Sequence, residues 1–149
     1  MCRVLIDTNI LMNSLSPTRP EHQEAREVID YCSGWGDFGM VCGLSLKDVY
    51  YLSTKLYGEQ KARDIVRKLM DLLVIAPVDG EVCDMALNSD ELDFEDGIIR
   101  ACAELNDADV IVTHDKDAFA HSLIRSMTAA EYLEIARARN KRPLSPNMS

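Results

Sequence analysis

Short apolar runs alternate along the chain with longer stretches of helical periodicity, and this alternation constrains the fold more than any other feature. The runs at 3–6, 38–42, 73–77 and 109–113 are β-rich and bounded by Gly, Pro or polar residues, as buried strands are. Helical periodicity marks 21–32, a run from 45, and 59–72, 79–87, 93–105 and 129–138. Met127 closes a short edge strand, and 115–120 is a turn or short helix. Parallel strands need crossover connections, so the pattern predicts an α/β fold, a three-layer α/β/α sandwich with a mainly parallel central sheet.

The length of 149 residues suits one domain, which we expect to span 1–140. Residues 141–149 contain two prolines and no apolar periodicity, so we expect a flexible C-terminal tail. The longest apolar runs are far shorter than a membrane span, and the first residues lack the apolar region of a secretory signal. The five cysteines form no Cys-x-x-Cys pair. We therefore expect a cytoplasmic protein with reduced thiols and no membrane contact.

The acidic charge of the chain is concentrated in one stretch. The formal net charge is −9, yet 79–117 alone holds 13 acidic and two basic residues, and the remainder is slightly basic. A generic nucleic-acid binder is expected to be basic overall. The acidic stretch is therefore either a solvated face or a set of carboxylates that converge on cations.

Several acids stand where a ligand site is expected. Asp7 and Asp115 both follow the carboxyl ends of predicted strands, where α/β sheets bind ligands, although a lone Asp there is often a turn former or cap. Asp48 follows Ser45 by three residues and Asp96 follows Asp93 by three, and both spacings also match a capping box.

A cap needs one or two of the three carboxylates in Asp93-Phe94-Glu95-Asp96. Converging carboxylates repel one another, and a divalent cation removes that repulsion. Mg²⁺ and Mn²⁺ prefer oxygen ligands and serve phosphoryl chemistry, so the acids indicate a site for Mg²⁺ (or Mn²⁺).

Four motifs in order resemble those of PIN-domain nucleases over nearly the whole chain. They are Val4-Leu5-Ile6-Asp7-Thr8-Asn9, Ser45-Leu46-x-Asp48, Asp93-Phe94-Glu95-Asp96-Gly97-Ile98 and Ile111-Val112-Thr113-His114-Asp115-Lys116-Asp117. The short single-domain format is similar in particular to the VapC-like toxin ribonucleases of toxin–antitoxin pairs.

The resemblance implies a metal-dependent endoribonuclease, with Asp7, Asp48, Asp96 and Asp115 as the catalytic acids. Asp7, Asp96 and Asp115 match the family's metal-binding acids, whereas Asp48 stands where many members have Glu and could act through water. The auxiliary candidates are Asp93 and Asp117, for which cap and turn roles are equally open, and the orienting groups Asn9 and Thr113.

The resemblance also implies partners: an RNA substrate, an antitoxin protein and a second copy of the chain in a homodimer. Tyr51 and Leu56 would give an apolar surface for either protein partner. One alternative is a catalytically silent PIN-like module that binds RNA or protein. Another is a different metal-dependent phosphohydrolase on an α/β sheet, such as a haloacid-dehalogenase-like phosphatase. That class has Asp-x-Asp after its first strand, where this chain has Asp7-Thr8-Asn9.

Overall fold

Five strands and seven α-helices alternate along the part of the chain that the computed structural model describes, residues 1–34 and 36–140. The predicted tail at 141–149 lies outside the described residues. The strands are β1 (Arg3–Ile6), β2 (Phe38–Cys42), β3 (Val74–Ala76), β4 (Val110–Val112) and β5 (Arg125–Met127). The helices are α1 (Thr8–Asn13), α2 (His22–Cys32), α3 (Ser45–Tyr57), α4 (Glu59–Leu72), α5 (Gly80–Asn88), α6 (Phe94–Leu105) and α7 (Ala129–Asn140), and η1 (Lys116–Phe119) is a 3-10 helix.

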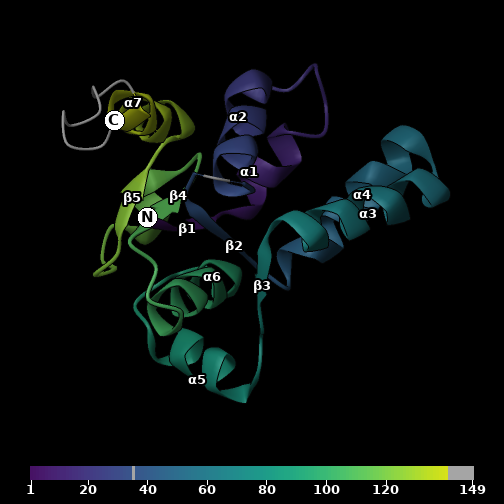
Figure 1. The fold of residues 1–149 in the computed structure, drawn as a ribbon. Helices are drawn as coiled ribbons and strands as arrows, with labels where there is room; N and C mark the ends of the chain where they lie inside the picture. The colour runs from purple at the N-terminus through teal and green to yellow at the C-terminus, as the bar shows by residue number, and fades with distance from the viewer. Residues whose placement is uncertain (35, 141–149) are drawn as a thin grey trace.

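The strands form one sheet in the order β3-β2-β1-β4-β5, and all four neighbouring pairs are parallel (Figure 1). At the centre of the sheet, Ile6 of β1 stands opposite Val41 on one side and Val112 on the other. The strands β2 and β3 lie on one side of β1, whereas β4 and β5 lie on its other side. The strand order therefore reverses between β1 and β4, which is where sheets of this kind bind ligands.

Alternate residues of each strand face the two sides of the sheet. Val4 and Ile6 belong to a core shared with buried residues of α1, α2 and α7, whereas Leu5 belongs to a second core with α5 and α6. Helices therefore cover both faces, and the predicted α/β/α sandwich is confirmed. The helices α3 and α4 pack against each other and extend to one side of the sheet (Figure 1). Gly58 separates these two helices with a φ of 90°, a conformation that favours glycine.

The segment after β1 is a helix, which the apolar periodicity of the sequence did not predict. Thr8–Asn13 forms α1, with Asp7 as its N-cap and with Ile10 and Leu11 buried against the sheet. This helix places the residues that follow Asp7 directly beside the carboxyl ends of the central strands.

The other predicted elements are confirmed, with boundaries that differ by at most two residues where the prediction gave both ends. The edge strand that Met127 closes is β5, and the predicted turn after Asp115 is η1. All five cysteines are free thiols, as expected. Within the described residues, no helix is both long and apolar enough to cross a membrane.

Candidate functional site

Asp7 lies at the point where the strand order reverses, because it follows β1 and its backbone N–H donates to Val112 of β4 at 2.9 Å. Its side chain is only 5% exposed. The backbone N–H of Thr8 donates to Oδ1 of Asp7 at 2.7 Å, and the hydroxyl of Thr113 donates to Oδ2 at 2.8 Å. Hydrogen bonds from two neighbouring segments therefore fix the orientation of this carboxylate.

Burial raises the pKa of the Asp7 carboxyl above its usual range. The hydrogen bonds from Thr113 and Thr8 oppose this shift, and the nearby charge of Asp115 adds to it. Asp7 is thus a desolvated carboxylate with a second acid close by, an arrangement that a bound cation would stabilise.

The amino end of α6 brings three further carboxylates to the same place. Oδ1 of Asp93 caps the helix by accepting from the backbone N–H groups of Glu95 at 2.8 Å and Asp96 at 3.2 Å. Burial, followed by the charges of Asp93 and Asp7, raises the pKa of Asp96 to about 6. The carboxylates of Asp7 and Asp96 therefore lie close enough to repel each other.

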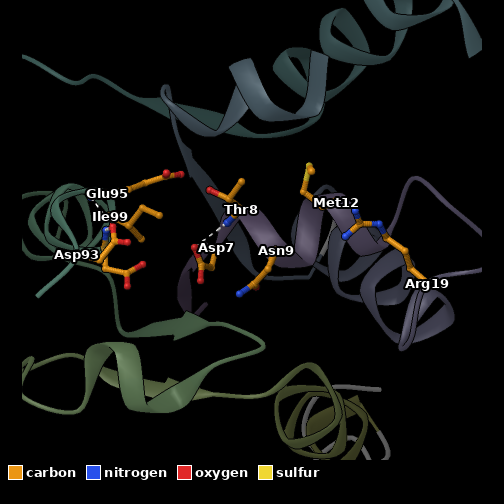
Figure 2. Close-up of a pocket in the computed structure, with 9 residues that line it drawn as sticks. Asp7, Thr8, Asn9, Met12, Arg19, Asp93, Glu95 and Ile99 are labelled. Carbon is orange, nitrogen blue, oxygen red and sulfur yellow. Dashed lines mark hydrogen bonds between the residues drawn. The ribbon is translucent and has the colours of Figure 1, made fainter. Parts of the chain in front are cut away.

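These residues line a pocket of about 330 Å³ between the carboxyl end of β1 and the start of α6 (Figure 2). The central floor is made by residues after β1, with the acids of α6 on one side and Met12 and Arg19 on the other (Figure 2). The complete lining is Asp7, Thr8, Asn9, Met12, Arg19, Asp93, Glu95, Asp96 and Ile99. A second pocket of about 240 Å³ shares Asp93 and Asp96 with the first and also includes Asp117.

The loop after β4 brings Asp115 near this pocket without placing it in the lining. Asp115 is exposed, and its Oδ1 accepts from the backbone N–H of Asp117 at 3.1 Å, so it also caps η1. Asn9 accepts from the backbone N–H of His114 at 3.1 Å. Asn9 thus ties α1 to the loop that carries Asp115, which is the geometry expected of an orienting group.

Asp48 lies beside the pocket rather than in it. Its carboxylate accepts a hydrogen bond from the side chain of Lys47 at 2.9 Å. The pKa of Glu95 is raised first by its own burial and next by the charge of Asp48. The alternative of a capping box is wrong for Asp48, because α3 has no side-chain cap and Ser45 instead bonds the Thr8 hydroxyl at 2.6 Å. For Asp96 only half of that box is present, the bond from its backbone N–H to Asp93.

Five of the nine residues that line the pocket were not predicted as site residues: Thr8, Met12, Arg19, Glu95 and Ile99. Glu95 was visible only as one of three clustered carboxylates. Thr8 stands inside the Asp-Thr-Asn motif, which could have pointed to it. Arg19 lies in a loop without periodicity, and nothing in the sequence marks it.

The donors in the pocket suit a hard divalent cation, because all of the charged ligand candidates are carboxylates. Among residues 1–34 and 36–140, no group of three or more His, Cys, Asp or Glu side chains is gathered closely enough to enclose an ion. Mg²⁺ does not need such an enclosure, since it is commonly bound by one or two carboxylates with waters and substrate phosphate in the other positions. Asp7 and Asp96 fit that mode of binding.

Fold and site together define an α/β protein with an acidic pocket at the switch point of a parallel sheet. The sequence model of the PIN domain matches residues 3–117, and the chain belongs to this family. Because the chain is a PIN domain, it is not a haloacid-dehalogenase-like phosphatase, and that alternative is wrong. A comparison with curated proteins gives no match.

Solved structures with the same fold include a toxin–antitoxin complex from Klebsiella pneumoniae, with a TM-score of 0.64 and 22% identity over 85% of this chain and 97% of that one. VapC20 from Mycobacterium tuberculosis, described as a toxin that cleaves the sarcin-ricin loop, has a TM-score of 0.64 and 16% identity over 78% and 93% of the two chains. DNA-bound VapBC from Salmonella typhimurium has a TM-score of 0.64 and 17% identity over 87% and 99%. At these identities the likeness concerns the fold.

Proposed function

We propose that the chain is a metal-dependent endoribonuclease that hydrolyses RNA phosphodiester bonds in the pocket at the β1/β4 switch point. The observation that carries this proposal is the convergence of Asp7 and Asp96, from the first strand and the sixth helix, in one pocket of about 330 Å³. Membership of the PIN domain family supports it, as does the similar fold of VapC20, which is described as a sarcin-ricin loop cleaving toxin.

In this proposal Asp7, Asp96 and Asp115 hold Mg²⁺ or Mn²⁺, and Asp48 contributes through water from its place beside Glu95. A cation bound there supplies an activated water and neutralises charge on the phosphate. Thr113 keeps Asp7 oriented, and Asn9 holds the loop of Asp115 against α1. Asp93 and Asp117 are auxiliary acids at the rim, where the first caps α6 and the second lines the adjoining pocket.

The decisive test is cleavage of a labelled single-stranded RNA with Mg²⁺ or Mn²⁺ and with EDTA. We expect cleavage only with the metal. Asp96→Asn should abolish it while leaving the melting temperature equal or raised, because the substitution relieves repulsion from Asp7 and Asp93. The matched control is Asp84→Asn, the same charge change at an exposed position of α5, which should retain activity.

Two results would contradict the proposal. An active Asp96→Asn variant would remove Asp96 from the chemistry. RNA binding without cleavage under any metal condition would favour the catalytically silent PIN-like module.

We further propose that this nuclease is the toxin of a toxin–antitoxin pair, a single domain over 1–140 that acts in the cytoplasm and forms a homodimer. The Klebsiella and Salmonella structures with the same fold are toxin–antitoxin and VapBC complexes. Tyr51 and Leu56 are 61% and 42% exposed, so they are free to contact a protein partner. Expression without an antitoxin should stop bacterial growth, and light scattering on the purified chain should give about twice the 16.7 kDa of one copy.

A further inference from the structure

Arg19 is the basic residue in an otherwise acidic pocket. The lining contains four carboxylates, from Asp7, Asp93, Glu95 and Asp96, and one guanidinium. Figure 2 shows Arg19 on the side of Met12, with the acids of α6 across the pocket. Negative and positive charge are thus separated along the pocket rather than paired within it.

The loop between α1 and α2 holds Arg19 in a defined place. The backbone N–H of Arg19 donates to the carbonyl of Ser16 at 3.0 Å, and the hydroxyls of Ser16 and Thr18 bond each other at 3.0 Å. Pro17 lies within this turn and Pro20 follows it, and both restrict the backbone. The side chain therefore starts from a fixed point at the edge of the pocket.

The guanidinium of Arg19 has no partner among the described residues 1–34 and 36–140, where it makes no ion pair and no hydrogen bond. Arg100 and Arg139, in contrast, are both held by carboxylates, the first by Asp90 at 2.6 Å and the second by Asp37 at 2.5 Å. Arg19 is partly buried, so its unpaired donors favour an incoming anion.

A phosphate of an RNA strand is the anion that suits this position. The planar guanidinium presents two parallel N–H donors that match two phosphate oxygens, which is why arginine is common where phosphates are recognised. The carboxylates across the pocket repel phosphate unless a cation lies between them. Arg19 is the part of the pocket lining that attracts a phosphate by its own charge.

We propose that Arg19 is a phosphate-binding residue, and that it binds the phosphate adjacent to the scissile phosphate on the same RNA strand. The inference rests on the proposed ribonuclease function and adds a substrate-positioning subsite to it. With one phosphate at Arg19, the next along the strand lies toward Asp7 and Asp96. Arg19 thereby helps to determine which bond of the strand enters the acidic part of the pocket.

The first test compares Arg19→Gln with Arg125→Gln. The second variant removes the same charge from an exposed residue at the amino end of β5, whereas the pocket lies at the carboxyl ends of the strands. We expect Arg19→Gln to raise KM about tenfold with kcat within about twofold, because a charge-assisted hydrogen bond is lost. The slope of log Kd against log salt should fall by about 0.7, the value of one phosphate contact on a single strand. Arg19→Lys should restore part of the affinity, and melting curves should be unchanged in all three variants.

The second test replaces single phosphates of the RNA, one at a time, by neutral methylphosphonates and measures binding by fluorescence anisotropy in the cleavage-deficient Asp96→Asn protein. One neutral position beside the cleavage site should weaken binding to the chain with Arg19 and have no further effect on Arg19→Gln. A merely structural role for Arg19 would not produce this position-specific loss of coupling.

The outcomes separate the two proposals. If the wild-type chain cleaves RNA and Arg19→Gln behaves like Arg125→Gln in KM and salt slope, the phosphate subsite is overturned and the ribonuclease stands. If the chain binds RNA without cleaving it, the ribonuclease is overturned. A neutral position whose effect disappears in Arg19→Gln would then still support phosphate binding by Arg19, and the absence of any such position would overturn it. If it binds no RNA at all, both proposals fall.

Discussion

Among residues 1–34 and 36–140, Asp37 accepts more hydrogen bonds than any other carboxylate outside the pocket. It is 4% exposed and joins the segment before β2 to α7 through the hydroxyl of Tyr132 at 2.6 Å and both terminal nitrogens of Arg139. The backbone N–H of Cys2 donates to it as well, at 3.0 Å. Burial alone would raise the pKa of Asp37, but the hydrogen bonds from Arg139 and Tyr132 outweigh burial and lower it.

A lowered pKa in the folded state makes this residue a source of acid sensitivity. The charged form is favoured by folding, so its contribution is fully present above the unfolded pKa of about 3.9 and is lost as the pH falls through the folded value. We expect Asp37→Asn to lower the free energy of unfolding by about 1–3 kcal/mol at neutral pH. This deficit relative to wild type should shrink below about pH 4.

Urea denaturation at neutral pH and at about pH 3 measures this difference. The control is Asp30→Asn, the same change at an exposed position of α2, which should cost less than about 0.5 kcal/mol at either pH. A deficit for Asp37→Asn that stays constant with pH would show that the charge of Asp37 does not contribute.

At the scale of elements, the start of α6 depends on Asp93, which serves both as a cap and as a pocket residue. Asp93→Ala removes the acceptor for the N–H groups of Glu95 and Asp96 and should cost about 1 kcal/mol of stability. Asp93→Asn keeps an oxygen at that position, so its stability should be close to wild type. Thermal melts and RNA cleavage on both variants separate the two roles.

A stable Asp93→Asn variant with reduced cleavage would identify the charge of Asp93 as part of the site. Equal cleavage by Asp93→Asn and wild type would show that Asp93 acts only as the cap of α6. A stable Asp93→Ala variant would contradict the assignment of Asp93 as the cap that organises this end of α6.

Most elements could be predicted because their apolar spacing repeats over two or more turns or over a full strand. Four apolar residues of α2 stand at helical spacing i, i+3, i+4 and i+7 and are all buried: Ala25, Val28, Ile29 and Cys32. The helix α1 could not be predicted in this way, since six residues give no second repeat. It is held by the cap at Asp7 and by burial of Ile10 and Leu11, which are tertiary features.

The acids of the site were predictable for a related reason. Asp7 and Asp115 follow β1 and β4, so sheet topology brings both to the carboxyl ends of the central strands. Asp96 lies in the first turn of α6, and the placement of that helix brings it to the pocket. The place of Arg19 depends on the path of the loop from Ser16 to Pro20, which no periodic pattern encodes. The position of Asp48 depends on how α3 packs against α1, through the Thr8–Ser45 bond.

At the scale of the whole molecule, the net charge of −9 makes the chain an unusual partner for RNA. Part of that charge is gathered in the pocket, where burial and the charges of Asp93 and Asp7 raise the pKa of Asp96, so the charged form of Asp96 is costly. A bound divalent cation would offset this cost in the folded state and would find no such site in the unfolded chain. The predicted metal should therefore be visible in stability as well as in catalysis.

We expect Mg²⁺ or Mn²⁺ at about 100 times its Kd to add about 2.7 kcal/mol to the free energy of unfolding, which is a rise of roughly 5–10 °C in melting temperature. Scanning fluorimetry against metal concentration measures the shift, with NaCl at matched ionic strength to separate specific binding from screening. Asp96→Asn should lose most of the shift, while Asp84→Asn, which changes the same charge on α5, should keep it. Equal rises in melting temperature in the two variants would mean that the cation stabilises the acidic surface in general. The prediction of a metal bound in the pocket would then be wrong.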